Sequence, residues 1–348
     1  VGCELEKTDS ELTDGKCSIH PNMEIELIDE ENYFFRFSKY QQALLDLYKA
    51  HPDFVVPTSR LGEIAKFVES GLQDFSISRL KEKMSWGVPV PDDDQQVMYV
   101  WFDALVNYIS TIGWPEDTEN FEKFWGNKDE PLALQVAGKD NLRQQSAMWQ
   151  AMLLSAGLPT SKQIMIHGFI TSNGQKMSKS LGNVVNPFDL IKKYGIDAVR
   201  YYLLREIPPA DDGDYSEKRM NEVYSSDLAN ELGNLVMRIT TLAEKDGLKI
   251  EPTPYILPPT LLFDNFEFNL ILENIWKQIK TLNKQTDDFA PWKKTSEERK
   301  EFLTKSLNGI NQIGYELQPF LPETAEKILK ATFGKITKIS PLFLRLTK

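Results

Sequence analysis

Strand-type and helix-type patterns alternate through much of this 348-residue chain, and this alternation constrains the fold more than any other feature. Residues 95–110 begin with the β-rich run Val97–Trp101 and continue with apolar residues at helical spacing. The same order recurs in residues 132–157, where the strand meets Gly138, and a further strand is expected in residues 163–170. Repeated strand–loop–helix units with buried strands predict a parallel α/β sheet, whose ligands lie at the carboxyl ends of the strands.

Helices are expected on both sides of these units. Ser38 is placed to cap a helix that ends before His51-Pro52, and a second helix covers Leu61–Leu72. After about Tyr215 the strand patterns stop, and three apolar stripes predict a helical bundle whose last stripe ends before Pro319 and Pro322. The stripes comprise Leu228, Leu232, Leu235, Ile239 and Leu242; Leu272, Ile275, Ile279 and Leu282; and Leu303, Leu307, Ile310 and Leu317.

Length and composition indicate a soluble globular protein of two or three domains, with 41% hydrophobic and 26% charged residues. No apolar run is long enough to cross a bilayer, and no secretory signal opens the sequence. Because the chain begins at Val1 rather than at a methionine, we interpret it as a piece of a longer protein. The net charge of -11 argues against nonspecific coating of nucleic acid, so such a partner would need local basic patches. Only Cys3 and Cys17 are present, which fits a reducing cytoplasm.

Lys176 and Lys179 place two cations in one short loop between Gly174 and Gly182. Glycine backbones adopt conformations that other residues avoid, so such a loop can close over an anion. A solvated basic turn is the alternative, and the loop by itself does not decide between the two.

The sequence KMSKS at residues 176–180, between HGF and LGNVVNPFDLIKKYGIDAVRYYLLRE, resembles the second signature of the class I aminoacyl-tRNA synthetases. The chain resembles the methionyl-tRNA synthetases of that class through NYFFR, ISR, YVWFDALVNYIS, AGKDN, MWQAML, LGNLVMR and APW, which follow the family order over nearly its whole length. The resemblance implies ATP-dependent activation of methionine to methionyl-adenylate with Mg²⁺. Transfer to the 3′-terminal ribose of methionine tRNA would follow.

The fold that the resemblance implies is α/β, the second half of a class I Rossmann-type nucleotide fold, followed by an all-α anticodon-binding helical bundle. Four parts are expected. They are the end of a connective insertion at 1–95, with a partial zinc knuckle in about 1–22; the C-terminal half of the catalytic domain at 96–205; a linker that contacts the tRNA stem at 206–225; and the anticodon-binding bundle at 226–348.

The resemblance assigns the lysine loop to the activation step. In that step the methionine carboxylate attacks the α-phosphorus of ATP, and negative charge builds up on the departing pyrophosphate. Lys176 and Lys179 are expected to stabilise that charge in the transition state, with Ser178 and Ser180 as hydroxyl donors. The same ATP site is expected to include His167, Gly168 and Met177.

Two further residues are assigned near ATP. Arg79 resembles an arginine that reaches into the ATP site, with a surface ion pair as the alternative. Asp140 resembles an acid that contacts the ATP ribose or the adenylate. A helix N-cap is its alternative, and one carboxylate can do both.

The resemblance also defines a methionine pocket, whose expected walls are Trp101, Ala104, Leu105, Tyr108 and Trp149. Aromatic faces suit a thioether, although such residues at helical spacing are also typical of a core. Asp103, expected to be buried in this apolar segment, is assigned to the substrate amino group. Gln145 stands where some family members carry a histidine near the sulfur, and it still offers a hydrogen-bond donor.

Cys3, Cys17 and His20 supply three ligands of a tetrahedral metal site, and zinc needs four. The family pattern has an upstream CxxC pair whose first cysteine falls just before Val1. Zn²⁺ is therefore expected only when that cysteine is present. Two reduced loop cysteines without a metal are the alternative.

Asn234 and Arg238 lie one helical turn apart beside a leucine stripe, so both can face solvent. Trp292 follows Ala290-Pro291 in a loop, where a core tryptophan is less expected. The resemblance assigns these three residues to the methionine anticodon, through indole stacking and bonds to base edges and phosphates. Asn234 alone also fits a polar helix face.

The other class I signature, a HIGH-type motif that binds the ATP phosphates, does not occur around any of His20, His51 and His167. We therefore expect a methionine–tRNA ligase whose N-terminal catalytic half lies outside this sequence or on another chain, and whose activity needs that half. A noncatalytic tRNA-binding fragment or subunit is the alternative, which the lysine loop disfavours. A leucyl, isoleucyl or valyl synthetase is disfavoured by the order around YVWFDAL.

Overall fold

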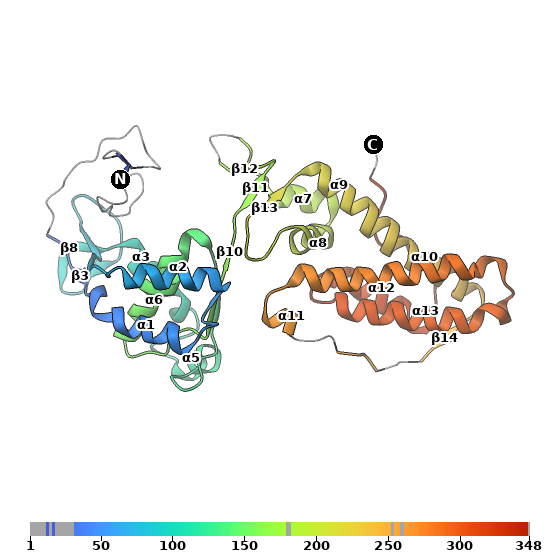
Figure 1. The fold of residues 1–348 in the computed structure, drawn as a ribbon, viewed down its shortest axis with the longest axis horizontal. Helices are drawn as coiled ribbons and strands as arrows, with labels where there is room; N and C mark the ends of the chain where they lie inside the picture. The colour runs from blue at the N-terminus through green and yellow to red at the C-terminus, as the bar shows by residue number, and fades with distance from the viewer. Residues whose placement is uncertain are drawn as a thin grey trace. The chain divides into compact units, whose positions relative to one another are not determined.

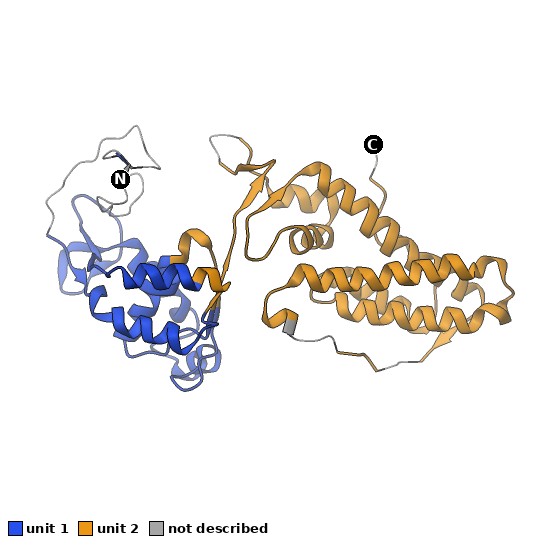
Figure 2. Cartoon of the chain, viewed as in Figure 1, with its two compact units in different colours: residues 1–54, 61–134, 143–163 blue, residues 55–60, 135–142, 164–348 orange. Residues whose placement is uncertain are grey.

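The computed structural model describes residues 12–13, 16–17, 31–178, 182–251, 254–257 and 261–346 (Figure 1). The chain divides into two compact units (Figure 2). Unit 1 comprises Val1–Phe54, Leu61–Leu134 and Arg143–Gln163, and unit 2 comprises Val55–Arg60, Gln135–Leu142 and Ile164–Lys348. The domain boundaries expected at residues 95, 205 and 225 stay a prediction.

Strands and helices are mixed in the first half of the chain. In order these elements are β1 Leu12–Thr13, β2 Lys16–Cys17, β3 Phe34–Phe35, α1 Gln41–Ala50, β4 Val55–Val56, α2 Thr58–Glu69, β5 Phe75–Ser76, β6 Ser78–Leu80, β7 Pro89–Val90, β8 Asp93–Met98, α3 Val100–Ala104, α4 Asn107–Ser110, α5 Thr118–Trp125, β9 Leu134–Gly138, α6 Trp149–Ser155, β10 Gln163–His167, β11 Ile170–Ser172 and β12 Gln175–Lys176.

Helices dominate the second half. In order the elements are α7 Pro187–Tyr194, α8 Ile196–Glu206, β13 Gly213–Tyr215, α9 Glu217–Val223, α10 Asn234–Lys245, β14 Lys249–Ile250, α11 Leu261–Asp264, α12 Phe268–Phe289, α13 Ser296–Leu317, α14 Pro322–Ala331 and β15 Gly334–Lys335.

Parallel strand pairs confirm the predicted α/β class. One sheet has the order β4-β10-β9, and its β4 and β10 are parallel. A second sheet has the order β12-β11-β13, in which β11 runs parallel to β13 and antiparallel to β12 (Figure 1). The single strand expected in residues 163–170 is wrong in detail, because Gly168 and Phe169 separate β10 and β11, which belong to different sheets.

The first predicted strand–helix unit also differs from the structure. Its strand is β8, which spans Asp93–Met98 rather than Val97–Trp101 and pairs antiparallel with β6 and β7. Only Pro91 and Asp92 separate β7 from β8. A connection this short joins antiparallel strands, whereas a parallel pair needs a crossover of a dozen or more residues.

The two helices expected near the start of the described chain are confirmed as α1 and α2, with bounds shifted by a few residues. The cap assigned to Ser38 is wrong. Its backbone N–H and its hydroxyl both donate to Asp74 Oδ1, at 3.0 and 2.7 Å, and a 3-10 turn at Phe37–Tyr40 leads into α1. A carboxylate from a distant segment therefore competes for the side chain that sequence reasoning gave to the helix end.

The predicted helical bundle is confirmed in unit 2. Its apolar stripes lie on α10, α12, α13 and a π-helical segment before α10, and every stripe residue is buried except Leu242 and Leu282, which pack partly buried against the same core. The third stripe ends with α13 at Leu317, and Pro322 begins α14. Strands do not stop completely at Tyr215, because β14 and β15 form a two-residue antiparallel pair. Over the described ranges, no helix combines the length and apolar character that crossing a membrane requires.

A buried ion pair links α10 to α13. Two of the three guanidinium nitrogens of Arg299, Nε and Nη2, donate to the Asp246 carboxylate, at 2.6 and 2.5 Å. The side chains are only 7% and 3% exposed. Arg299 Nη1 also donates to the Lys294 carbonyl at 2.9 Å, so one side chain joins the end of α10, α13 and the turn between α12 and α13.

Loss of this carboxylate should destabilise the bundle. Asp246→Asn leaves Arg299 buried without an anion, so we expect the free energy of unfolding at pH 7 to fall by about 3 kcal/mol. The Arg299 hydrogen bonds lower the pKa of Asp246, so the pair stabilises the fold above the ordinary carboxyl range and stops doing so as the pH falls through that lowered pKa. The difference between variant and wild type should therefore shrink in acid, as measured by urea unfolding at several pH values.

The matched control is Glu273→Gln, which breaks an exposed pair with Lys277 on α12. This variant should change the free energy of unfolding by less than about 1 kcal/mol. Equal effects of the two substitutions would contradict the role given to the buried pair.

Candidate functional site

Lys176 lies at the end of a short hairpin made of β11 and β12. The two strands are joined by Asn173 and Gly174, whose φ angles are +52° and +75°. Two positive φ angles define a type I′ turn, which asparagine and glycine adopt at low cost. Lys176 pairs with Thr171 across the hairpin, so the turn sets the place of the lysine.

Asn183 closes the loop that follows the hairpin. Its side-chain oxygen accepts from the Ser178 backbone N–H at 2.9 Å, and its side-chain nitrogen donates to the Lys176 carbonyl at 3.1 Å. Met177 and Ser178 lie half-buried between these bonds. Lys179 and Ser180 lie outside the described residues, so their assigned roles stay predictions.

The ammonium of Lys176 lies over an aromatic ring. Its Nζ is 5.2 Å from the centroid of Phe169, and Lys139 Nζ lies 4.5 Å from the same centroid. Lys139 also pairs with Asp212 at 2.7 Å, and this hydrogen bond holds the pKa of Asp212 below its ordinary value. Within the described ranges Lys176 is exposed and makes no ion pair, so its charge is available to an anion.

The ends of β9 and β10 bring three predicted residues together. A Cβ added to Gly138 would lie 2.7 Å from Asp140 Oδ1 and 3.6 Å from His167 Cε1. Asp140 and His167 are exposed, whereas Gly168 is buried. Asp140 lies inside the 3-10 turn Lys139–Asn141, whose N-cap is Gly138, so the structure does not support the helix-cap alternative. The carboxyl ends of strands are where α/β sheets bind ligands.

Arg79 extends from β6 in unit 1. Its Nη1 donates to Ser76 Oγ at 2.6 Å and to the Ser78 carbonyl at 2.7 Å, and its guanidinium lies 4.7 Å from the Tyr99 ring centroid. These contacts replace the surface ion pair that was the alternative for Arg79. Contact with ATP stays a prediction.

Three of the residues predicted to bind methionine meet in unit 1. Gln145 Nε2 donates to the Tyr108 hydroxyl at 2.7 Å, and the ring centroids of Tyr108 and Trp149 are 6.1 Å apart. Trp149 is buried, whereas Tyr108 is 37% exposed. The indole nitrogen of Trp149 and Oε1 of Gln145 are buried with no hydrogen-bond partner among the described residues. Unsatisfied buried polar atoms of this kind can mark a place where a ligand or a water binds.

The remaining residues of the predicted pocket differ in exposure. Leu105 is buried and Trp101 half-buried, whereas Asp103 and Ala104 are exposed. The expectation that Asp103 is buried is therefore wrong, because no residue of the short helix α3 is buried. The role of Asp103 toward the substrate amino group stays a prediction.

Unit 1 also contains an apolar cavity of about 260 Å³. Of the residues predicted to bind methionine, only Trp149 lines it. The other lining residues are Phe35, Phe102, Val106, Ile109, Trp114, Met152, Leu153, Ser155, Ala156 and Leu158. The cavity thus uses a different face of the α3–α4 segment from Leu105 and Tyr108, and it does not by itself define the methionine pocket.

Two of the residues assigned to the anticodon are in contact. The Arg238 guanidinium lies 4.8 Å from the Trp292 ring centroid and pairs with Asp287 at 2.7 Å. Trp292 is 47% exposed in a 3-10 turn, as expected for a residue that is not part of the core. Asn234 and Arg238 are both half-exposed on α10.

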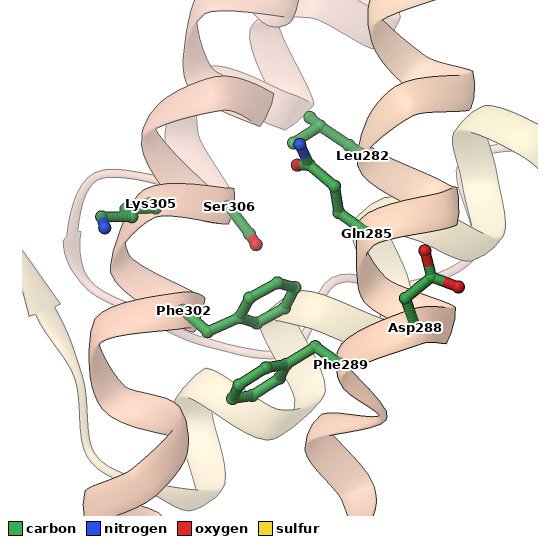
Figure 3. A pocket seen from close by; sticks show the side chains of 7 residues that line it. All are labelled: Leu282, Gln285, Asp288, Phe289, Phe302, Lys305 and Ser306. Carbon is green, nitrogen blue, oxygen red and sulfur yellow. The ribbon is translucent and has the colours of Figure 1, made fainter.

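A cavity of about 570 Å³ opens between α12 and α13, beside the stacked rings of Phe289 and Phe302 (Figure 3). Its other lining residues are Leu282, Gln285, Asp288, Lys305 and Ser306. None of the residues assigned to the anticodon lines it, so this cavity and the predicted RNA-facing residues are separate features of the bundle.

The predicted zinc ligands are not tested. Cys3 and His20 lie outside the described residues, and of Cys17 only the backbone in β2 is described. In the part of the chain that the structure describes, no group of three His, Cys, Asp or Glu residues could hold a metal ion. Zinc binding stays a prediction.

Sequence reasoning missed the residues that hold the lysine hairpin. Phe169, Asn183, Asp212 and Asp214 received no role, although Asn173-Gly174 is a strong hairpin signal that would have located the turn. The aspartates carry no such signal, because their partners lie about forty residues away along the chain.

Comparison with known protein families places the chain in a class. The family model described as "tRNA synthetases class I (M)" matches residues 2–240, and the chain belongs to this family. The match includes the lysine hairpin and ends within α10.

Within this family the chain is similar to proteins named methionine–tRNA ligase. It is 44% identical to that of Thermosynechococcus vestitus, with 94% of this chain and 66% of the relative covered, and 41% identical to that of Fusobacterium nucleatum, with 94% and 54% covered. The chain therefore spans between half and two thirds of the length of these relatives.

Solved structures agree with this placement. The methionyl-tRNA synthetase of Mycobacterium tuberculosis in complex with methionyl-adenylate matches with a TM-score of 0.86 and 34% identity, over 98% of this chain and 75% of that chain. Its apo form matches with a TM-score of 0.79 and 33% identity, over 92% and 70%.

Removal of the Asn183 side chain should loosen the lysine loop. Asn183→Ala removes both hydrogen bonds that join Lys176 and Ser178 to the far side of the loop, so we expect faster cleavage by trypsin after Lys176, by about fivefold or more for a loss near 1 kcal/mol. The control is Asn274→Ala on the exposed surface of α12, which should leave the cleavage rate unchanged. Equal cleavage rates in all three proteins would show that Asn183 does not hold the loop.

Proposed function

We propose that this chain forms part of an enzyme that activates methionine with ATP and transfers it to methionine tRNA. The observation that carries the proposal is Lys176, an exposed cation without an ion pair in the described ranges, on a hairpin held by Asn183 and by an I′ turn. The similarity to methionine–tRNA ligases supports the same reaction.

Activation forms a bond between a methionine carboxylate oxygen and the α-phosphorus of ATP and breaks the bond from that phosphorus to the bridging oxygen of pyrophosphate. The pyrophosphate leaves with the bonding electron pair. Lys176, and Lys179 beside it in sequence, stabilise this leaving group most strongly when its charge is largest, which is how a contact raises a rate rather than an affinity. Mg²⁺ accompanies ATP as the counter-ion of its phosphates.

In this proposal, residues of unit 1 bind methionine. Tyr108, Gln145 and Trp149 offer an aromatic surface and hydrogen-bonding groups, which suit a flexible side chain with a polarizable sulfur. The relative from Mycobacterium tuberculosis was solved with methionyl-adenylate, which supports this assignment.

In this proposal, the helical bundle of unit 2 binds the tRNA. Trp292 offers an exposed ring for a base, and Arg238 lies against that ring with its charge only partly neutralised by the exposed Asp287. Arg299 donates to the Pro291 and Lys294 carbonyls on either side of Trp292, so a buried side chain fixes the turn.

We propose further that activation needs a polypeptide with a HIGH-type motif, because the 348 residues contain none and the relatives are longer. That polypeptide is the N-terminal half of the same enzyme. The small number of cysteines supports a reducing, cytoplasmic location.

The first test concerns Lys176. With the polypeptide that carries the HIGH-type motif present, Lys176→Ala should slow methionine-dependent ATP–pyrophosphate exchange by about tenfold or more and change the KM for methionine by less than about twofold. Lys218→Ala, an exposed lysine on α9, is the control and should have no effect. Equal losses in methionine binding and in rate would instead indicate a ground-state role.

The second test concerns Trp292. Its removal should cost about 1–3 kcal/mol of tRNA binding and lower charging of methionine tRNA by about tenfold, with exchange unchanged. Trp86→Ala is the control, since Trp86 is 76% exposed in unit 1. A large fall in the thermal midpoint with parallel losses of exchange and charging would make Trp292 a core residue. Binding of tRNA without exchange under any condition would favour a noncatalytic subunit.

A further inference from the structure

Two aspartates of the segment Asp211–Tyr215 hold the lysine hairpin from one side. The Asp212 carboxylate accepts from the Phe169 backbone N–H at 2.8 Å and from Lys139 Nζ at 2.7 Å. These bonds fix the start of the hairpin, where Phe169 carries the ring beneath Lys176.

Asp214 holds the other end of the hairpin. Its Oδ1 accepts from the Thr171 hydroxyl at 2.6 Å and from the Gly174 backbone N–H in the turn at 2.7 Å. One carboxylate oxygen therefore ties the middle of β11 to the I′ turn.

Asp214, Thr171 and Lys176 lie in one row of the sheet. Asp214 pairs with Thr171 between the parallel strands β13 and β11, and Thr171 pairs with Lys176 between β11 and β12. Two strand spacings separate the aspartate from the lysine, about 10 Å along the row. The carboxylate is thus used by Thr171 and Gly174, and the charge of Lys176 is not neutralised by it.

The segment lies very close to the start of the hairpin. A Cβ added to Gly168 would lie 2.1 Å from the Asp211 carbonyl oxygen, so no side chain fits between the start of the hairpin and this segment. Asp211 itself is exposed, and its side chain makes no hydrogen bond or ion pair within the described ranges.

From this arrangement we propose that Asp214 is a positioning residue of the activation reaction, which holds the hairpin so that Lys176 meets the leaving pyrophosphate. The inference rests on the proposed function of Lys176. Asp214 does not touch the reacting atoms. It acts through Thr171 and Gly174.

Three variants test this proposal by ATP–pyrophosphate exchange in the complete enzyme. Asp214→Ala removes the accepting oxygen and should lower kcat by about tenfold or more, with the KM for methionine within about twofold of wild type. Asp214→Asn keeps an oxygen that both donors can use, so it should retain kcat within about threefold. Asp211→Ala removes the same charge from the same segment and should behave as wild type.

Thr171→Val removes the hydrogen bond from the Thr171 hydroxyl to Asp214 and keeps the one from Gly174. It should therefore lower kcat by less than Asp214→Ala does. This variant tests the proposal even if Asp214→Ala folds poorly. Two results would overturn the proposal. One is an Asp214→Ala enzyme as active as Asp211→Ala, and the other is Asp214→Asn losing as much activity and as much thermal stability as Asp214→Ala.

Hydrogen exchange separates this proposal from the proposed function. Deuterium uptake of a peptide covering residues 170–178 should rise in Asp214→Ala and stay at the wild-type level in Asp211→Ala. Unchanged uptake in Asp214→Ala overturns the positioning role whatever the activity. If uptake rises but Lys176→Ala exchanges pyrophosphate at the wild-type rate, then Asp214 holds a hairpin that activation does not use, and the function proposed for Lys176 is what fails.

Discussion

The position of Lys176 depends on a sheet that is too small to be stable by itself. β11 and β13 each have three residues and β12 has two, and an isolated hairpin of this size is marginal in water. Hydrogen bonds from side chains outside β11 and β12 add the stability that the few backbone hydrogen bonds between the strands do not supply. Asp212 and Asp214 hold the hairpin from the β13 side, and Asn183 closes the loop beyond it. The base of the hairpin is therefore fixed by hydrogen bonds, whereas the Lys176 side chain is exposed.

In the bundle, a buried charged side chain fixes the turn that carries an exposed residue. Trp292 is exposed, as the proposed stacking on a base requires, and an exposed residue gains little rigidity from packing. Arg299 supplies that rigidity from within, because it is anchored by Asp246 and donates to the carbonyls around Trp292. The buried ion pair thus helps to fix the position of the exposed Trp292 ring. The outward-facing pair of Arg238 and Asp287 keeps a cation beside that ring.

Some of this architecture follows from the sequence and some does not. Helical stripes such as Leu303, Leu307 and Ile310 predicted the bundle, because periodic burial is a local property that a single segment displays. The antiparallel pairing of β8 could not be predicted from its apolar run, since direction is set by the short connection at Pro91-Asp92. Ser38 was predicted to cap a helix, but its hydroxyl donates to Asp74, a residue that comes near only in the folded chain.

The candidate site shows the same division. The motif residues Lys176 and Asn234 were found by resemblance, and the contact of Arg238 with Trp292 agrees with a shared role. The supports were missed, because Asp214 lies forty residues from Gly174 and nothing in its own neighbourhood indicates a bond to a turn. Asp103 was expected to be buried from the apolar residues around it, but the five-residue helix α3 contains no buried residue.

The function proposed for Lys176 requires its ammonium to move from the Phe169 ring to the phosphates of ATP during activation. A crystal structure of the complete enzyme with methionine and a nonhydrolysable ATP analogue tests it most directly. We expect Lys176 Nζ within hydrogen-bond distance of the terminal phosphates, about 2.7–3.2 Å, with the Asp214 bonds to Thr171 and Gly174 unchanged. A bound analogue with Lys176 still over Phe169 and far from every phosphate oxygen would contradict it.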